Sequence, residues 1–217
     1  PPPPPPIFFF TLTPEYDIRL SLVGSEMCIR DIIELERCFL LHQRPYRETS
    51  VIAELLTEHE GRVSLVCKGV RSAGKKASSL RSTLQPFALL NASWSGKTDL
   101  KSLRQAEVIT PAPRLHQSQL YAGLYLNELN FRMIHSGESN INLFSRYQAS
   151  ISEIASLDAD DTISIEVSLR RFEARLLATL GFELDFMRDA VTGEPITADE
   201  DYRFHTEYGL SLIHISE

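Results

Sequence analysis

The chain has 217 residues, of which 43% are hydrophobic and 24% are charged, a balance typical of folded globular proteins. This composition excludes disorder throughout the chain, and no apolar run approaches the roughly 20 residues that a membrane-spanning helix requires. The formal net charge is −7. The three cysteines, Cys28, Cys38 and Cys67, show neither CxxC nor regular spacing, which argues against a disulfide framework or a cysteine zinc site and indicates a reducing compartment.

Both ends of the chain differ in character from its middle. Residues 1–35 begin with six prolines and IFFF, and Ser21–Asp31 resembles the peptide obtained when sequencing-adapter DNA is translated. A signal peptide is the alternative, but the usual order of basic, apolar and small-residue regions is absent. We therefore expect residues 1–35 to be extraneous and disordered, with residues 1–34 packing poorly and Phe8–Phe10 outside the main core. Residues 211–217 are expected to be an extraneous tail.

Residues 36–110 contain five short β-type runs separated by polar or glycine-containing breaks, the spacing of a small barrel and not of βαβ units. The predicted strands are Arg37–Gln43, Thr49–Thr57, Arg62–Lys68, Pro86–Trp94 and Asp99–Ile109. Gly61 suits the turn before the third strand, where every second residue from Val63 to Cys67 is predicted to face the core. Broken alternation near Ser102 indicates a β-bulge in the last strand.

The charge of this region is opposite to that of the whole chain. Between Arg62 and Arg104 there are nine basic residues and one acid, Asp99, so this segment carries +8 and the remainder −15. The nine basic residues are Arg62, Lys68, Arg71, Lys75, Lys76, Arg81, Lys97, Lys101 and Arg104. Such a field on an acidic protein indicates one face that binds a polyanion, and we predict that these residues contact nucleic-acid phosphates.

Residues 71–85 are predicted to form a mobile basic loop between the third and fourth strands, because they have few apolar anchors. The alternative is a solvated linker whose charges serve solubility. Four cations without an acid among them favour phosphate contact.

Residues 111–210 have the periodicity of helices. The predicted helices are 114–135, 142–157 and 162–180. Their apolar stripes are interpreted as core: Tyr121, Tyr125, Leu129 and Met133 in the first; Phe144, Tyr147, Ile151 and Ile154 in the second; Ile165, Leu169, Phe172, Leu176 and Leu180 in the third. Gly181 suits the C′ position of the third helix. A turn is predicted at residues 192–195 and a hairpin around residues 202–208.

The sequence indicates no catalytic site. The six histidines are scattered, and no HxH, HExxH or GxSxG motif is present. Asp158, Asp160 and Asp161 could form a carboxylate metal cluster, but acids between two helices more often cap the second helix. We therefore expect no enzyme activity, no cofactor and no bound metal. The alternative is a nuclease that uses the basic face and the acids near Asp160, and strand annealing measured against magnesium-dependent cleavage would distinguish the two.

Five segments resemble the RecO family of bacterial recombination mediators. They are residues 39–50 (FLLHQRPYRETS), 61–69 (GRVSLVCKG), 84–87 (LQPF), 123–129 (GLYLNEL) and 169–173 (LRRFE), in the family's order. The resemblance implies an α+β architecture: a five-stranded oligonucleotide-binding (OB) fold barrel at residues 36–110, then a helical RecO-type domain at 111–210. That domain is expected to be incomplete, because RecO chains usually continue beyond the position of Leu210. Some relatives carry a four-cysteine zinc site, but Asp189 and Thr192 stand where a CxxC pair is expected.

The resemblance also implies a function and its partners. RecO proteins bind single-stranded DNA through phosphate contacts and base stacking, and they anneal complementary strands. With RecR, they assist RecA loading on DNA coated by single-strand-binding protein (SSB). Double-stranded DNA is a further expected partner, a membrane is not, and the expected location is the cytoplasm, at the nucleoid.

The helical domain of the family receives the acidic, hydrophobic C-terminal tail of SSB, a ligand that requires an apolar pocket beside a cation. By resemblance, Leu169, Arg170 and Phe172 are the residues expected to form this site, with Arg170 against the tail. The alternative is that Arg170 only pairs with Glu166 on a solvated face.

Overall fold

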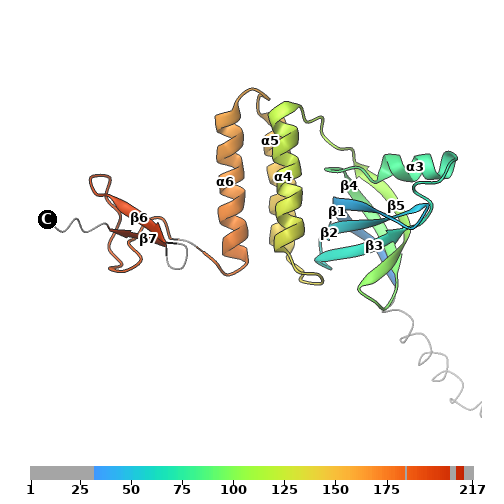
Figure 1. Cartoon of the computed structure of the whole chain (residues 1–217), viewed down its shortest axis with the longest axis horizontal. Coiled ribbons are helices and arrows are strands. Elements are labelled where there is room, and N and C mark those ends of the chain that lie inside the picture. The colour runs from blue at the N-terminus through green and yellow to red at the C-terminus, as the bar shows by residue number, and fades with distance from the viewer. Residues whose placement is uncertain (1–31, 184, 206–208, 213–217) are drawn as a thin grey trace, which may run out of the picture.

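The computed structural model describes residues 32–183, 185–205 and 209–212 (Figure 1). Figure 1 shows three regions in chain order: a barrel, a group of helices beside it, and a small hairpin beyond the last helix. The predictions on residues 1–31, including the packing of Phe8–Phe10, lie outside the described residues. Among the helices that the structure describes, none has both the length and the apolar character that a membrane span needs.

Five strands close into a barrel in the order β1-β2-β3-β5-β4. They are β1 (Ile32–Tyr46), β2 (Ser50–Thr57), β3 (Arg62–Cys67), β4 (Leu89–Ser95) and β5 (Leu100–Thr110). Neighbouring strands are antiparallel except β3 and β5, which are parallel. The bulge predicted near Ser102 is present at Arg104. The predicted α+β architecture with an N-terminal five-stranded barrel is confirmed.

β1 begins at Ile32, earlier than the predicted start at Arg37, because it pairs with two neighbours. Residues 38–46 pair with β2, and residues 32–39 pair with β4. A register shift around Leu35, whose φ is 54°, changes the direction of the strand. A long, bent strand of this kind closes a sheet into a barrel without leaving an exposed edge.

Alternation in β3 places every second side chain in the barrel core, as predicted. Val63 and Cys67 are at most 3% exposed and pack in the same cluster as Trp94, the only tryptophan in the chain. At the turn before β3, Gly61 has a φ of +69°, and a Cβ there would lie 2.3 Å from the backbone oxygen of Glu138. Both the turn and the close approach of the helical region therefore require glycine.

The prediction of a mobile loop at residues 71–85 is wrong, because most of this segment is a helix, α3 (Lys75–Thr83). Ala77 and Leu84 are buried, and Leu80 is half-buried against the barrel core. Their spacing of three and four residues is helical, but three apolar positions among serines and lysines give a weak signal. Figure 1 shows α3 beside the upper end of the barrel.

Three helices follow the barrel: α4 (Gln117–Met133), α5 (Ile141–Ser156) and α6 (Thr162–Thr179). The predicted core stripes of α5 and α6 are confirmed: Phe144, Tyr147, Ile151, Ile154, Ile165, Phe172 and Leu176 are buried, and Leu169 and Leu180 are half-buried. Gly181 follows α6 with a φ of +86°, and the amide of Phe182 donates to the carbonyl of Leu177 at 2.8 Å. This is the predicted glycine-dependent end of the helix.

The predicted core row of α4 is wrong in its first half. Tyr121 and Tyr125 are 74% and 42% exposed. The buried face consists of Gln119, Ala122, Gly123, Leu126, Asn127 and Asn130. A Cβ at Gly123 would lie within 3.0 Å of the side chains of Leu115 and Phe87, so a larger residue there would have to displace them. The polar side chain of Asn127 can be buried because its amide oxygen accepts a hydrogen bond from the hydroxyl of Tyr147 on α5. Tight packing and a buried polar contact therefore override the apolar pattern.

Besides the cluster inside the barrel, a second hydrophobic cluster joins the barrel to the helices. The ring of Phe39 on β1 lies 5.2 Å from that of Phe144 and 5.0 Å from that of Tyr147, both on α5. Burial raises the pKa of the Tyr147 hydroxyl, which stays protonated and donates to Asn127. This second cluster holds the helices against the barrel, so surfaces on the two regions keep a fixed relation to each other.

Beyond α6, β6 (Tyr202–His205) and β7 (Gly209–Leu212) form a two-stranded antiparallel sheet, which confirms the predicted hairpin. The turn predicted at residues 192–195 lies earlier in the chain, at residues 189–193. The amide of Gly193 donates to the carbonyl of Asp189 at 2.9 Å, and the Asp189 carboxylate accepts from the amide of Thr192 at 2.7 Å. β7 continues two residues past the expected boundary at residue 210.

Candidate nucleic-acid interface and helical pocket

Five of the predicted cations lie on α3 and on the segment that leads into it. Lys68, Arg71, Lys75, Lys76 and Arg81 are all exposed. The guanidinium of Arg81 donates to the carbonyl oxygens of Val70 and Ser72 at 3.1 and 3.3 Å, which ties α3 to the preceding segment. These cations are therefore held on an ordered surface and not on a mobile loop.

The β1–β2 turn adds a cation that the sequence reasoning missed. The amide of Arg71 donates to the carbonyl of Thr49 at 2.8 Å, and its guanidinium donates to the carbonyl of Arg47 at 3.4 Å. Arg47 is exposed, and its guanidinium lies over the ring of Tyr46, 5.1 Å from the centroid. The available signal was the run RPYR at residues 44–47, two cations that flank an aromatic residue. We use the term α3 basic surface for Arg47, Lys68, Arg71, Lys75, Lys76 and Arg81.

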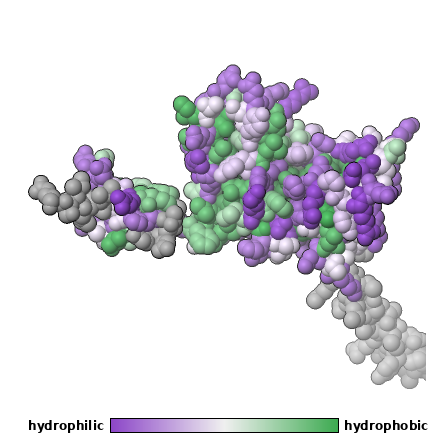
Figure 2. Space-filling view, in the orientation of Figure 1, coloured by the Kyte–Doolittle hydropathy of each residue, from purple (hydrophilic) through white to green (hydrophobic). Residues whose placement is uncertain are grey.

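The electrostatics of the α3 basic surface favour an anion. Residues 44–50 and 68–85 together contain seven basic residues and one acid, Glu48. Lys75 and Lys76 occupy the first turn of α3, which has no acid and no side-chain cap. The positive end of the helix dipole repels these two lysines, so their position is unfavourable without an anion. A bound phosphate would be stabilised both by the lysines and by the free backbone amides of the first turn. Figure 2 shows that hydrophilic residues predominate on this part of the barrel.

The remaining barrel cations lie elsewhere. Lys97 and Arg104 are exposed and Lys101 is half-buried, in or next to the β4–β5 hairpin. The side chain of Arg104 donates to the hydroxyl of Ser95 at 2.9 Å. Because α3 leads into the start of β4 and this hairpin follows its end, the two basic groups lie toward opposite ends of that strand (Figure 1). The predicted single basic face is therefore divided into two groups.

Arg62 belongs to neither group, although the sequence places it with them. Its guanidinium donates to Glu54 at 3.0 Å and to the carbonyl of Ile134 at 2.9 Å, and it lies 5.2 Å from the ring centre of Phe131. Glu54 is only 4% exposed and also accepts from Ser64 at 2.7 Å. Arg62 thus joins the barrel to α4 and neutralises a buried carboxylate, so we exclude it from the proposed DNA contacts.

Aromatic residues contribute little to the barrel surface. Within residues 32–110, the rings of Phe39, Phe87 and Trp94 are buried, and Tyr46 is the half-buried exception. Among the Phe, Tyr and Trp rings of this part of the chain, only that of Tyr46 is accessible for base stacking.

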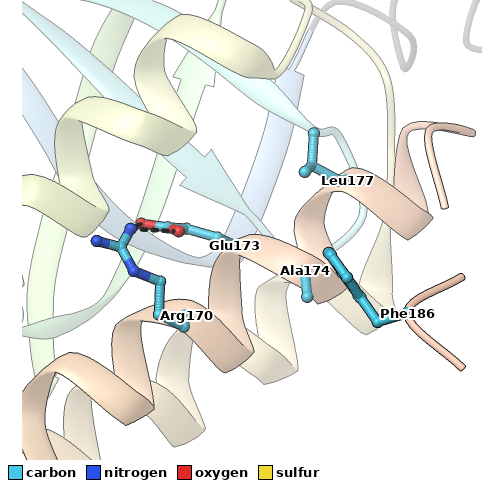
Figure 3. Close-up of a pocket in the computed structure, with 5 residues that line it drawn as sticks. All are labelled: Arg170, Glu173, Ala174, Leu177 and Phe186. Atoms are coloured by element: carbon cyan, nitrogen blue, oxygen red, sulfur yellow. Dashed lines mark hydrogen bonds and ion pairs between the residues drawn. The ribbon is translucent and has the colours of Figure 1, made fainter. Parts of the chain in front are cut away.

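A pocket lies on α6, apart from the α3 basic surface. Arg170, Glu173, Ala174 and Leu177 of α6 and Phe186 of the following segment line a pocket of about 300 Å³ (Figure 3). Of the residues predicted to bind a partner tail, only Arg170 lines this pocket. Phe172 is 2% exposed and Leu169 is half-buried in the same core, because both point toward α4 and α5. The pocket therefore includes Arg170 and leaves out Leu169 and Phe172.

The charges at the pocket are paired. Arg170 donates to both oxygens of Glu173 at 3.0 and 2.8 Å and to Glu166 at 3.3 Å, and these acids raise the pKa of Arg170. The Glu173 carboxylate also accepts from the hydroxyl of Tyr125 at 2.7 Å, which raises the pKa of that hydroxyl. The side chain of Arg170 is 66% exposed. Since exposed ion pairs are weak, an incoming carboxylate can compete for this guanidinium.

A shallower groove of about 470 Å³ continues along α6 from the pocket, because Arg170 and Ala174 line both. Ile163 and Val167 in this groove are 76% and 43% exposed. Figure 2 shows hydrophobic residues among the helices and at the start of the hairpin region. The groove on the outer side of α6 thus combines the apolar Ile163, Val167 and Ala174 with the charged Glu166, Arg170 and Arg171.

The aspartates before α6 act as local caps. The carboxylate of Asp161 accepts from the amide of Ser164 at 3.1 Å, and that of Asp158 accepts from the amide of Asp160 at 3.0 Å. The hydrogen bonds of Asp161 lower its pKa. Within the described ranges, no group of three or more His, Cys, Asp or Glu side chains is placed to hold a metal ion. The geometry supports the capping interpretation of these acids.

Comparison with known proteins gives matches over nearly all of the described chain. Residues 33–112 match the family "Recombination protein O N terminal", and residues 117–212 match "Recombination protein O C terminal". The DNA repair protein RecO of Vibrio vulnificus is 43% identical over 175 residues, which are 81% of this chain and 69% of the relative. Those of Proteus mirabilis and Haemophilus influenzae are 43% and 42% identical, over 80% and 81% of this chain and 68% and 71% of theirs.

Proposed function

This chain belongs to the RecO family of DNA repair proteins, with an OB-fold barrel followed by the family's helical region, and from that premise we propose that it is a recombination mediator. It binds single-stranded DNA on the α3 basic surface and anneals complementary strands. With RecR, it assists RecA loading on SSB-coated DNA in the cytoplasm, at the nucleoid. The single observation that carries the proposal is the α3 basic surface, where Arg47 of the β1–β2 turn lies beside the five cations on α3 and the segment before it.

Annealing follows from the kind of contact that this surface offers. Lysine and arginine side chains neutralise phosphates without reading base edges, so they hold strands of any sequence. Strands held by their phosphates keep their base edges free to pair. The scarcity of exposed aromatic rings on the barrel supports this, because extensive stacking would occupy the bases that must pair. Double-stranded DNA presents the same phosphates and is a further partner.

The pocket on α6 is the proposed site for the SSB tail. An acidic tail that ends in an apolar residue needs a hydrophobic recess beside a cation, and Ala174 and Leu177 supply the recess while Arg170 supplies the cation. The tail carboxylate would replace Glu173 as the partner of Arg170. The barrel then holds DNA while α6 holds SSB, which brings the coated strand to the annealing surface.

A strand-annealing assay tests the proposal. The variant Lys75→Ala, Lys76→Ala, Arg81→Ala removes three cations of the α3 basic surface, and we expect it to anneal complementary oligonucleotides at least about tenfold more slowly, because phosphate contacts are lost. The matched control Arg146→Ala, Arg171→Ala, Arg175→Ala removes three exposed helical cations and should anneal normally. Equal annealing by both variants would refute the role of α3. Magnesium-dependent cleavage by the same sample would instead favour the nuclease alternative.

A further inference from the structure

A pocket of about 320 Å³ lies between β1 and α4, where the barrel meets the helices (Figure 1). Leu41 of β1 and Leu124 and Phe131 of α4 are its apolar walls, and His42 and Asn127 are among its polar groups. We call it the β1–α4 pocket. Ligand sites in proteins have volumes of roughly 300 to 1,000 Å³, so this pocket is of the size that suits one small ring system.

Two of the side chains that line the pocket are stacked rings. The imidazole of His42 lies against the ring of Phe131, with centroids 5.1 Å apart and an interplanar angle of 24°. Phe131 is half-buried and packs against the cluster that joins the barrel to the helices, so its ring is held in place. His42 is exposed. A flat ligand can extend this stack, as bases do on the aromatic side chains of proteins that bind single strands.

The charged residues of the pocket favour a neutral occupant. Glu128 and Arg132 both line it, and they pair with each other at 2.6 Å. Because their charges cancel, they do not select an anion, but they present an acceptor and a donor side by side. The amide nitrogen of Asn127 carries two hydrogens and donates to the carbonyl of Leu40 at 3.4 Å. A nucleobase matches these features, since it is planar, uncharged and edged with donors and acceptors.

One face of β1 connects the β1–α4 pocket to the α3 basic surface. Residues two apart in a strand lie on the same face, so His42, Arg44 and Tyr46 form one row beside β2. At about 3.4 Å per residue, the row is roughly 14 Å long. At its end, the guanidinium of Arg47 lies over the ring of Tyr46. Rings that alternate with cations are typical of a surface that follows a single strand.

We propose that the β1–α4 pocket binds one unstacked base of single-stranded DNA, with His42 and Phe131 as the stacking residues. This inference rests on the proposed DNA binding by the α3 basic surface, and it adds a base contact to the phosphate contacts made there. The strand runs from the α3 basic surface along the row on β1, and one base leaves the row to enter the pocket.

This site gives the protein a means of distinguishing single strands from duplexes. A paired base lies inside the duplex stack and cannot enter the pocket unless it is first flipped out. The phosphate contacts of the α3 basic surface make no such distinction, because both forms of DNA present phosphates. Since the pocket holds a single base, the other base edges of the strand remain free to pair during annealing.

Fluorescence anisotropy with a labelled single-stranded oligonucleotide and the corresponding duplex tests the inference. His42→Ala should weaken single-strand binding by about five- to tenfold, which is the lower part of the range for the loss of one stacked base. Duplex binding should stay within about twofold. The salt slope of single-strand binding should not change, because stacking releases no counterions.

Two further variants separate stacking from a general structural effect. His42→Phe keeps a stacked ring and should restore single-strand binding. Phe131→Leu keeps an apolar side chain at the half-buried position but removes the ring, and it should weaken single-strand binding as His42→Ala does. The matched control is His135→Ala, since His135 is 81% exposed and does not line the pocket. It should bind both forms of DNA normally.

The outcomes distinguish this inference from the function on which it rests. If the unaltered chain binds no single-stranded DNA, the proposed function is wrong and the inference is lost with it. If Lys75→Ala, Lys76→Ala, Arg81→Ala weakens binding while His42→Ala keeps full affinity, the α3 basic surface stands and the pocket holds no base. Equal losses on single strands and duplexes, or no recovery with His42→Phe, would also overturn the inference, because the loss would then not arise from stacking.

Discussion

Arg62→Ala separates a structural cation from the DNA-binding cations to which its sequence position assigns it. The substitution leaves the carboxylate of Glu54 at 4% exposure with Ser64 as its remaining side-chain partner. Removing one partner of a buried ion pair costs roughly 3 to 5 kcal/mol, because the other charge stays buried and uncompensated. Arg62 is itself partly exposed, with 21% of its side chain accessible, so we expect a loss of about 3 kcal/mol in the free energy of unfolding.

Urea denaturation followed by tryptophan fluorescence measures this loss. Trp94 is the single tryptophan and is 1% exposed in the barrel core, so its emission reports barrel unfolding. The control is Arg132→Ala, which breaks an exposed helical pair with Glu128 and should cost at most about 0.5 kcal/mol. Adding Glu54→Gln to the Arg62→Ala variant removes the buried charge and should recover part of the loss.

DNA affinity supplies the second half of this prediction. Under conditions where Arg62→Ala remains folded, its affinity for single-stranded DNA should stay within about twofold of the unaltered chain, because Arg62 lies outside the α3 basic surface. The reasoning is refuted if stability falls by less than about 1 kcal/mol, or if the folded variant loses DNA affinity as strongly as the Lys75→Ala, Lys76→Ala pair.

Two further predictions concern the buried core. Tyr147→Phe leaves the amide oxygen of Asn127 without its donor, and should cost roughly 1 to 3 kcal/mol in urea denaturation; an unchanged midpoint would contradict the importance of this contact. Burial raises the pKa of Cys67 to about 12 from an ordinary 9.0, so its thiol ionises in the unfolded chain first, and stability should fall as pH rises from about 9 to about 12. Cys67→Ala should lose stability less steeply across that window, and equal slopes would count against the prediction.

The sequence predicts the barrel well because its strands follow one simple rule. In β3, successive side chains from Val63 to Cys67 point alternately into the core and away from it. This period of two identifies both the strand and its buried face. The same rule misses the start of β1 at Ile32, because a strand that bends to pair with two neighbours loses strict alternation. Gly61 was found as a turn residue, but its contact with Glu138 depends on a segment distant in sequence.

The candidate sites were harder to predict because they depend on which way a helix faces. On α6, Leu169 and Phe172 point to the core, whereas Arg170 between them points to the pocket, so adjacent residues in a motif do not share a site. On α4, Tyr121 occupies a regular apolar row and is nevertheless exposed. Phe186 gave no signal, because it joins the pocket through the tertiary position of the hairpin region.

The salt dependence of single-stranded DNA binding tests the central claim most directly. Each phosphate contact contributes roughly −0.7 to the slope of log K against log salt, so the variant Lys75→Ala, Lys76→Ala, Arg81→Ala should have a slope flatter by about one to two units. The control Arg146→Ala, Arg171→Ala, Arg175→Ala has the same net charge as the α3 variant, and it should keep the slope of the unaltered chain. If the α3 variant keeps both its slope and its affinity, the α3 basic surface does not hold the DNA.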